Sequence, residues 1–399
     1  MFARLALALS LLLAACGSTP ARHAVPADAL DLARIPGIPK ARGWGDRSPD
    51  LLGEVDGLSP GELAEAFPAA FGAPHHYLAL SGGGPNGAYG VGLLVGWTQS
   101  GTRPEFTIVT GVSTGAFIAP FAFLGPEYDD RLERAYTSYS TEDFFERKSL
   151  LSALTGDAAL DTEPLRQTIA ELFDQEMLDA VAREHRRGRR LLIGTTNLDA
   201  ARPVIWNLGE IAVSGAPDAL ELARAVILAS ASIPVAFPPV LFEVEVDGER
   251  HDEMHVDGLA SSQVFLYPSG LDWSGVLDRL QVTAQPKLYV IRNGVLETLP
   301  IEVQPKLSAI AAQSISSMML HQANGDLYRM YLTSVRDGID FHLAALPAEA
   351  ELQVGENWID PVAMRELFEL GRAHAAQGNP WAKAPPGFEA LSLGGAQLP

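Results

Sequence analysis

The sequence is poor in cysteine and in basic residues. Cys16 is the only cysteine among 399 residues, so no disulfide can form within the chain. Lysine and arginine total 29 against 49 aspartates and glutamates, giving a formal net charge of −20. Nucleic-acid binding needs clustered Lys and Arg, so this composition excludes nucleic acid as a partner. It also argues against docking on anionic lipid by charge, which leaves a lipid anchor or an apolar rim as the route to lipid.

The apolar run near the N-terminus is too short to cross a bilayer. Residues 5–13 follow Arg4, and they precede Leu13-Ala14-Ala15-Cys16. A bilayer span takes about 20 residues, so this segment is predicted to be a secretory signal at residues 1–15. Its end resembles a bacterial lipobox, which implies a lipid on Cys16 and an anchor in the cell envelope. Gly17 in the place of an aspartate favours the outer membrane, facing the periplasm, and plain secretion is the alternative.

Composition divides the rest of the chain into three parts. Residues 16–73 are rich in proline and glycine, which predicts a lipidated N-terminus and tether. Residues 74–378 carry regular hydrophobic segments and are long enough for one large domain. Residues 379–399 hold three prolines and are predicted to be a loose tail. No internal repeat is visible, and nothing in the sequence specifies an oligomeric state.

Strand-like and helix-like segments alternate through the central part. The expected strands are residues 77–80, 107–110, 191–194, 204–206, 241–246, 288–291 and 339–343. The expected helices lie within residues 88–99, 115–123, 127–140, 162–187, 219–229 and 304–332. Alternation of this kind predicts an α/β fold, a three-layer sandwich with a central, mainly parallel sheet. Residues 126–190 are a candidate cap over a site at the end of the second strand.

Two glycine-rich turns, each after a predicted strand, carry the chemistry. The second turn reads Gly-x-Ser-x-Gly at residues 111–115, the pattern of a nucleophile elbow, which holds Ser113 clear of the backbone at a helix N-terminus. The first turn contains Gly82, Gly83 and Gly84, and its backbone N–H groups would face an oxyanion formed beside Ser113. Together the turns predict an acyl-transfer site.

A serine nucleophile needs a base, and the sequence offers Asp257. It lies at the end of a strand-like run and is followed by Gly258. An ordinary Asp-Gly turn is the simpler interpretation of this pair on its own. As a base, Asp257 must be ionised, and we expect partial burial to raise its pKa.

The order and spacing of these motifs resemble the patatin-like phospholipases over residues 75–345. The resemblance includes Gly-Thr-Thr-Asn-Leu-Asp at residues 194–199 and Ala-Ser-Ala-Ser-Ile-Pro at residues 229–234. It implies a carboxylic ester hydrolase in which Ser113 is the nucleophile and Asp257 its base. The amides of Gly82, Gly83 and Gly84 would form the oxyanion hole. It implies no metal, no cofactor and a lipid or other ester as substrate.

The chain departs from that family at two positions. Asn86 stands where the family often has a basic residue, so the turn carries no charge of its own there. Leu259 follows Asp257-Gly258, where the family commonly has glycine or alanine. The first departure affects stabilisation of the oxyanion, and the second affects the shape of the aspartate loop.

Four other interpretations remain open at this stage. Gly82-x-Gly84-x-x-Gly87 matches a dinucleotide fingerprint, although no acid ends the second strand. A Ser-His-Asp triad could use His255, which shares a strand face with Asp257. The pair His251 and His255 has zinc-like spacing on a helix, but on a strand its members lie about 13 Å apart. A lipid-anchored scaffold or lipid-binding protein that keeps the fold without turnover is the fourth.

Overall fold

The computed structural model describes residues 22–47, 55, 57–147, 158–352, 359–378 and 380–388. Cys16 and the predicted signal segment lie outside the described residues. The strands are β1 (Arg42–Trp44), β2 (His76–Leu80), β3 (Ile108–Val112), β4 (Glu146–Arg147), β5 (Leu160–Asp161), β6 (Arg190–Asn197), β7 (Arg202–Asn207), β8 (Val240–Val246), β9 (Glu249–Asp257), β10 (Lys287–Arg292) and β11 (Asp340–Ala345). The helices are α3 (Pro60–Ala66), α4 (Gly87–Gln99), α5 (Thr114–Leu124), α6 (Asp129–Thr137), α8 (Glu163–Leu172), α9 (Gln175–Arg186), α10 (Leu208–Val213), α11 (Ala219–Ser230), α12 (Trp273–Arg279), α13 (Leu307–Arg336) and α14 (Pro361–Ala376).

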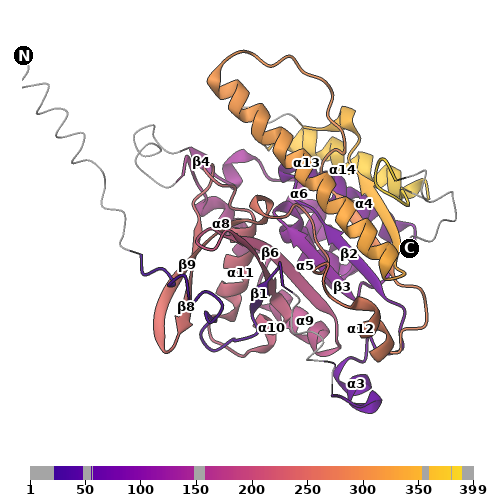
Figure 1. The fold of residues 1–399 in the computed structure, drawn as a ribbon. Coiled ribbons are helices and arrows are strands. Elements are labelled where there is room, and N and C mark those ends of the chain that lie inside the picture. Colours follow the sequence, from indigo (N-terminus) through magenta and orange to yellow (C-terminus); the bar gives the residue numbers. More distant parts are fainter. Residues whose placement is uncertain are drawn as a thin grey trace, which may run out of the picture.

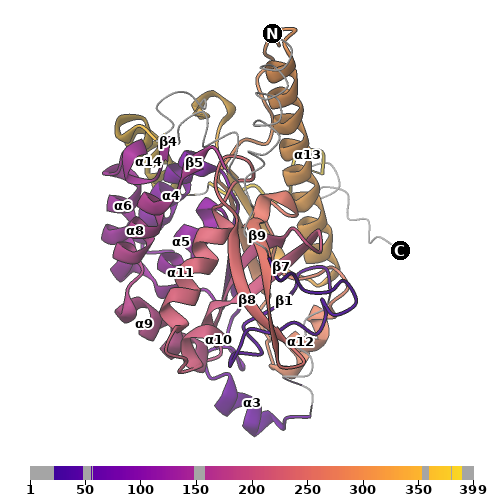
Figure 2. The ribbon, with the colours of Figure 1, turned by 90° about the vertical axis from the view of Figure 1, so that its left-hand side faces the viewer.

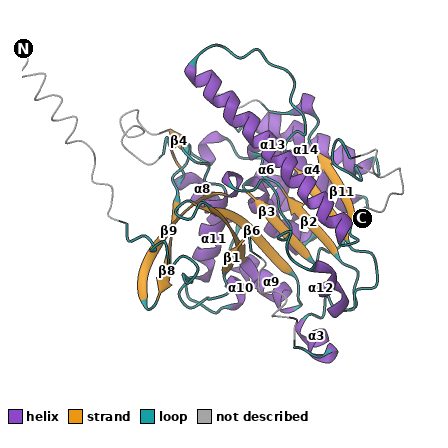
Figure 3. Ribbon diagram, in the orientation of Figure 1, coloured by secondary structure: helices purple, strands orange, loops and turns teal. Residues whose placement is uncertain are grey.

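A nine-stranded sheet runs through the molecule in the order β1-β7-β6-β3-β2-β10-β11, with β9 beside β6 and β8 beside β9 (Figure 3). Strands β6, β3, β2, β10 and β11 are parallel to their neighbours in this series. Strands β1, β7, β8 and β9 pair antiparallel. The predicted α/β fold is therefore confirmed, with a parallel centre and an antiparallel flank. Because β2, β3 and β10 are parallel, the turns that follow them meet at one edge of the sheet.

Helices cover both faces of the sheet, as the alternation predicted (Figure 2). Alternate residues of β2 serve the two layers: Leu78 and Leu80 pack with α4 and α5, and Tyr77 and Ala79 pack with α12 and α13. Each buried side chain of this size contributes about 1.5–3 kcal/mol through the hydrophobic effect. The two cores fix the sheet between the layers and hold its carboxyl edge in place.

Residues 126–190 extend the helical layer, which corrects the expectation of a cap. Helix α9 contacts α5, α10 and β6, helix α8 contacts α11, and helix α6 contacts α4 and α14. Their apolar faces are buried in the same core as α5. Residues 148–157 lie outside the described residues. Helix α14 was not among the expected helices, and its Gly371 lies so close to α4 that a Cβ there would be 2.1 Å from the Tyr89 carbonyl oxygen.

Residues 22–47 are part of the folded body, so the predicted tether is corrected here. Strand β1 pairs with β7, and the backbones of Arg34 and Glu245 exchange two hydrogen bonds of 3.1 and 2.8 Å. Val25, Ile35 and Ile38 are buried in the main core. The apolar side chains of this segment follow no helical or strand period. The segment is still held in place, because the free edge of β7 provides hydrogen-bond partners for its backbone.

The described end of the chain is also attached. Leu343 of β11 and Ala382 exchange two backbone hydrogen bonds of 2.8 Å, and Trp381 packs against Trp97 and Tyr289. Residues 380–388 are therefore not part of a loose tail, and residues 389–399 lie outside the described residues.

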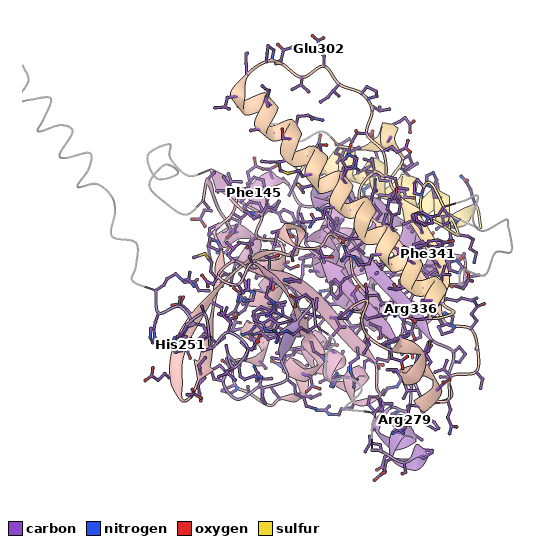
Figure 4. All side chains as sticks on the ribbon, viewed as in Figure 1. Phe145, His251, Arg279, Glu302, Arg336 and Phe341 are labelled. Carbon is purple, nitrogen blue, oxygen red and sulfur yellow. The ribbon has the colours of Figure 1, made fainter. Side chains whose placement is uncertain are left out.

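Helix α13 extends beyond the sheet at its first turns (Figure 1). The loop that leads into it leaves the carboxyl end of β10, and its outer part is marked by Glu302, whereas Arg336 marks the other end of the helix (Figure 4). Only the second half of α13 contributes buried residues, beginning at Ala323. No helix in the described ranges is both long enough and apolar enough to span a bilayer.

Candidate active site

Ser113 occupies the sharp turn between β3 and α5. Its backbone has φ 55° and ψ −124°, a conformation that is strained for any residue with a side chain. The turn needs glycine on both sides. A Cβ on Gly111 would lie 2.3 Å from the Gly115 carbonyl oxygen, and a Cβ on Gly115 would lie 2.3 Å from that of Leu80. The serine thus stands at the N-terminus of α5, where the helix dipole favours negative charge.

Asp257 reaches Ser113 because β3 and β9 share one edge of β6. The other edge of β6 is taken by β7. Val112, the last residue of β3, pairs with Gly194, and Asp257, the last residue of β9, pairs with Thr195. The two strands therefore meet end to end at neighbouring positions of β6. This pairing brings the residue after Val112, which is Ser113, next to Asp257.

The Asp257 carboxyl group is fully buried, and burial raises its pKa to about 7. The Leu259 amide donates to Oδ1 at 2.9 Å and acts in the opposite direction, as does the nearby Ser113 side chain. The second oxygen, Oδ2, has no well-formed hydrogen bond among the described residues. A carboxylate that is half ionised near neutral pH, with a free oxygen beside a serine, is suited to accept a proton.

Two serines behind the turn hold the pair in position. The Ser113 amide donates to Ser230 Oγ at 3.0 Å, and Ser230 Oγ donates to the Gly194 carbonyl at 2.6 Å. The Asp257 amide donates to the Ser232 carbonyl at 2.9 Å. Both serines lie in the Ala-Ser-Ala-Ser-Ile-Pro segment at residues 229–234, which resembles the family. The signal for Ser230 is a hydroxyl directly after the apolar run at residues 225–229.

The glycine turn after β2 lies against Ser113, but Gly82 differs from the expectation. A Cβ on Gly82 would lie 3.1 Å from the Ser113 Cβ, so the two turns are in contact. The Gly82 amide donates to the Gln263 carbonyl at 3.1 Å, which removes it from the predicted set of oxyanion donors. The amides of Gly83 and Gly84 have no acceptor within the described ranges. Gly83 cannot carry a side chain, because its Cβ would lie 1.6 Å from the Asn293 carbonyl oxygen.

The two residues that depart from the family pattern are both buried at the turn. Asn86 Oδ1 accepts a hydrogen bond of 3.0 Å from the Leu352 amide, so its side chain holds the segment after β11 against the turn. Leu259 packs over Gly82, where a Cβ on the glycine would come within 2.4 Å of its Cδ2 atom. Neither side chain brings charge to the site.

His255 is buried two residues before Asp257, but both its ring nitrogens are occupied elsewhere. Nδ1 lies 2.9 Å from Thr195 Oγ1, and Nε2 lies 3.1 Å from Glu253 Oε2. Trp206 Nε1 donates to the same Thr195 oxygen, so the threonine hydroxyl is free to donate to Nδ1. Burial lowers the pKa of His255, which fits a neutral ring that donates from Nε2 to Glu253. The geometry does not make this histidine the partner of Ser113.

None of the histidines at positions 251, 321, 342 and 374 is shown in contact with Ser113. His342 bonds to Asp340, and His374 contacts the Tyr89 hydroxyl. His321 is an exposed residue of α13. His251 lies on β9, four residues from His255, and it stacks on His23 at 4.2 Å. Within the part of the chain that the structure describes, no three His, Cys, Asp or Glu side chains gather as metal ligands.

The dinucleotide interpretation lacks its acidic residue. Strand β3 runs straight into Ser113, and Glu105 precedes the strand at the opposite edge of the sheet. The Gly82 amide is already used within the protein. A cofactor phosphate at this turn would therefore meet one donor fewer than the fingerprint requires.

Access to the dyad is narrow in this structure. Ser113 is 3 % exposed and Asp257 is not exposed at all. A cavity of about 1030 Å³ lies between the N-terminal segment, the sheet and α13, but neither dyad residue lines it.

One family model and two solved structures are similar to parts of this chain. Residues 78–267 match the family model of patatin-like phospholipases. No curated protein matches the chain significantly. Among solved structures, VipD from Legionella pneumophila is similar with 11 % identity and a TM-score of 0.39, covering 77 % of this chain and 67 % of VipD. The type III effector protein ExoU is similar with 11 % identity and a TM-score of 0.23, covering 76 % of this chain and 52 % of ExoU. The chain thus spans about half of ExoU. It carries a patatin-like phospholipase domain at residues 78–267, with the patatin fold.

Proposed function

We propose that this protein is a serine acyl hydrolase that cleaves lipid esters through an acyl-enzyme. The observation that carries the proposal is the pair Ser113 and Asp257. A strained serine at a helix N-terminus lies beside a fully buried carboxyl group whose pKa is raised to about 7. The match of residues 78–267 to patatin-like phospholipases supports a lipid hydrolase in general terms.

In the proposed reaction Asp257 accepts the Ser113 proton as the serine oxygen attacks the ester carbonyl carbon. The carbonyl oxygen becomes an oxyanion, which the amides of Gly83 and Gly84 stabilise. The alcohol leaves with the proton from Asp257, and the acyl group stays on Ser113. Water then loses a proton to Asp257 and attacks the acyl-enzyme, which releases the acid and restores the serine. An acceptor alcohol in the place of water would give transacylation.

The first turns of α13, together with the loop before them, support a lipid rather than a small soluble ester as substrate. Of the fourteen large apolar side chains that are well exposed in the described part, seven lie within residues 299–318, which we name the α13 tip. They are Leu299, Ile301, Val303, Leu307, Ile310, Ile315 and Met318. The tip holds one acid and one base, so it is neutral on a chain of net charge −20.

The place of the α13 tip determines what it would contact. It rises from the carboxyl end of β10, and β10 is parallel to β2, so the tip leaves the sheet at the edge that carries the glycine turn and Ser113. Exposed apolar surface of this extent marks a contact site. We propose that the tip contacts the surface of lipid aggregates and brings their esters to Ser113.

Membrane attachment through Cys16 is a separate part of the proposal. It rests on the sequence Leu13-Ala14-Ala15-Cys16 after a short apolar run. One acyl chain holds a protein only weakly, so stable attachment needs further acyl chains or a second contact such as the α13 tip. Replacement of Cys16 by alanine would release the protein from the membrane fraction if Cys16 carries the anchor.

Labelling with a fluorophosphonate probe tests the nucleophile directly. We expect the wild-type protein to be labelled and the Ser113→Ala variant to remain unlabelled. Ser314→Ala, which removes an exposed serine of α13, is the matched control and should label as wild type. Absence of labelling in folded wild-type protein, with and without detergent micelles, would favour a lipid-anchored scaffold or lipid-binding protein without turnover.

A further inference from the structure

Arg292 is a buried arginine that the reaction scheme above does not use. It is the last residue of β10, and Ile291 before it pairs with Leu80 of β2. The arginine therefore stands level with the start of the glycine turn. Its side chain is directed at that turn: one terminal nitrogen donates to the Gly82 carbonyl at 2.9 Å and to Ser81 Oγ at 3.1 Å.

No ion pair accounts for this charge. Arg292 is 7 % exposed and forms no salt bridge with a described carboxylate, although Glu351 and Asp326 attract it at longer range. Its Nε has no partner among the described residues. Burial lowers the pKa of Arg292 to about 10, so the side chain stays charged at neutral pH. A buried charge without a direct ion pair is costly, which calls for a reason at this position.

The Gly82 carbonyl belongs to the same peptide unit as the Gly83 amide. The peptide bonds of the described chain are trans, so C=O and N–H of one unit point in opposite directions. Arg292 therefore donates to the carbonyl oxygen of this unit. The Gly83 N–H points away from the arginine and has no acceptor among the described residues. A hydrogen bond to a carbonyl polarises the peptide and strengthens its N–H as a donor.

We propose that Arg292 is a positioning residue that fixes the Gly82–Gly83 peptide and makes the Gly83 N–H a stronger donor to the oxyanion on the Ser113 adduct. The inference rests on the proposed function. It also gives the turn a positive charge that Asn86, which bonds to Leu352, does not supply. The charge is supplied by β10 and acts on the turn through the Gly82–Gly83 peptide.

The surrounding contacts separate this role from simple support of the turn. Asn293 also holds the turn: its amide donates to Ser81 Oγ and its Nδ2 donates to the Ser81 carbonyl, both at 2.8 Å. These two bonds do not depend on the arginine side chain. Loss of Arg292 therefore removes the charge and its own bond to the Gly82 carbonyl, while the 2.7 Å bond from Ser81 Oγ to that carbonyl and the Asn293 clamp stay in place.

The test compares Arg292→Gln, Arg292→Lys and Arg103→Lys on a soluble 4-nitrophenyl ester. Arg103 is the control, because its side chain is 2 % exposed and donates to the Ala122 carbonyl and to Asp129, but it precedes β3 at the opposite edge of the sheet. For Arg292→Gln we expect kcat to fall roughly 10- to 100-fold, less than loss of a direct oxyanion donor, with KM within about twofold. Arg292→Lys keeps the charge and should lie between wild type and the glutamine variant. Arg103→Lys should lower the melting temperature and leave kcat within about twofold.

Inhibition by a trifluoromethyl ketone gives a second measurement on the same variants. The ketone forms a tetrahedral oxyanion with a reactive serine, whereas the free carboxylic acid product does not. We expect the inhibition constant of the ketone to rise in Arg292→Gln by the factor that kcat/KM falls, and that of the product acid to stay constant. If both constants rise together, or if the lysine and glutamine variants have equal kcat, Arg292 supports the turn only structurally. Wild-type protein that hydrolyses no ester would instead overturn the proposed function.

Discussion

Ser113 and Asp257 arrive at the same edge of β6 from opposite directions, on strands that end at neighbouring positions. Val112 pairs with Gly194 and Asp257 with Thr195, so the parallel strand β3 and the antiparallel strand β9 abut there. Neither strand can be extended without a clash, and the dyad forms where the two ladders stop. Backbone pairing therefore brings the nucleophile and its base together, and the hydrogen bonds of Ser230 and Ser232 hold them there.

The first prediction concerns the pH dependence of ester hydrolysis. Burial raises the pKa of Asp257 to about 7, and the carboxyl group must be ionised to accept the Ser113 proton. We expect kcat/KM to rise with pH from 5 and to reach half of its plateau near pH 7. A neutral 4-nitrophenyl ester measured from pH 5 to 9 gives this profile. A rate that is already constant at pH 5 would mean that the base has an ordinary carboxyl pKa.

The second prediction is that Asp257→Asn stabilises the fold while it abolishes activity. The folded state holds the proton of Asp257 more tightly than the unfolded state, whose carboxyl pKa is near 3.8. Between these two pKa values the native protein binds more protons, so wild-type stability falls as pH rises from about 4 to 7. Asparagine carries no charge and escapes this loss. We expect its unfolding free energy at pH 8 to exceed that of wild type by a few kcal/mol, about 4 at most.

Chemical denaturation at pH 4 and pH 8 measures this difference. At pH 4 most of the native carboxyl groups are protonated, so the advantage of Asp257→Asn should largely disappear. An advantage of equal size at both pH values would point to packing instead of ionisation. A buried carboxylate that must ionise for activity destabilises the fold, which is an expected cost of an active site.

The third prediction separates the dyad from a Ser-His-Asp triad. His255 connects Thr195 with Glu253, and Arg42 completes the buried group by an ion pair of 2.7 Å with Glu253. His255→Ala should therefore cost stability, about 2–4 kcal/mol, because it leaves a cavity and removes a donor to a buried carboxylate.

The kinetics of the same variant decide between the two mechanisms. We expect kcat of the folded His255→Ala protein to stay within about fivefold of wild type, with the pH midpoint unchanged. Loss of a triad histidine would lower kcat by roughly 10³-fold or more. Thermal unfolding on the same sample shows which fraction is folded at the assay temperature.

The positions of the chemical groups follow from short motifs, but their contacts do not. Gly-x-Ser-x-Gly after an apolar run predicts the turn at Ser113, because only glycine fits on either side of it. The pairing of Asp257 with Thr195 depends on where β3 ends, which no local pattern specifies. For the same reason no local pattern indicates that the Gly82 amide donates to the Gln263 carbonyl and so cannot serve as an oxyanion donor.

Single polar residues at the ends of apolar elements are the other part that the sequence did not reveal. Ser230 follows the apolar run at residues 225–229, and Arg292 follows the apolar run at residues 288–291. Each acts through backbone groups that lie far away in the chain, so no spacing links it to the motif it serves. An unexplained charge or hydroxyl directly after a buried run is the only signal for such residues.

The last prediction concerns the α13 tip and distinguishes lipid aggregates from soluble esters. Ile310 and Met318 are 51 % and 64 % exposed on the first turns of α13. The double variant Ile310→Ser/Met318→Ser removes apolar surface without filling or emptying the core. We expect it to hydrolyse phosphatidylcholine vesicles at least about tenfold more slowly, since each buried side chain of this size contributes about 1.5–3 kcal/mol. Hydrolysis of the soluble ester should stay within twofold, because neither residue touches the dyad.

Leu332→Ser, on an exposed position at the other end of the same helix, is the matched control and should leave both rates unchanged. A change of oligomeric state in the double variant, with vesicle hydrolysis intact, would assign the tip to contact between copies of the chain instead of lipid.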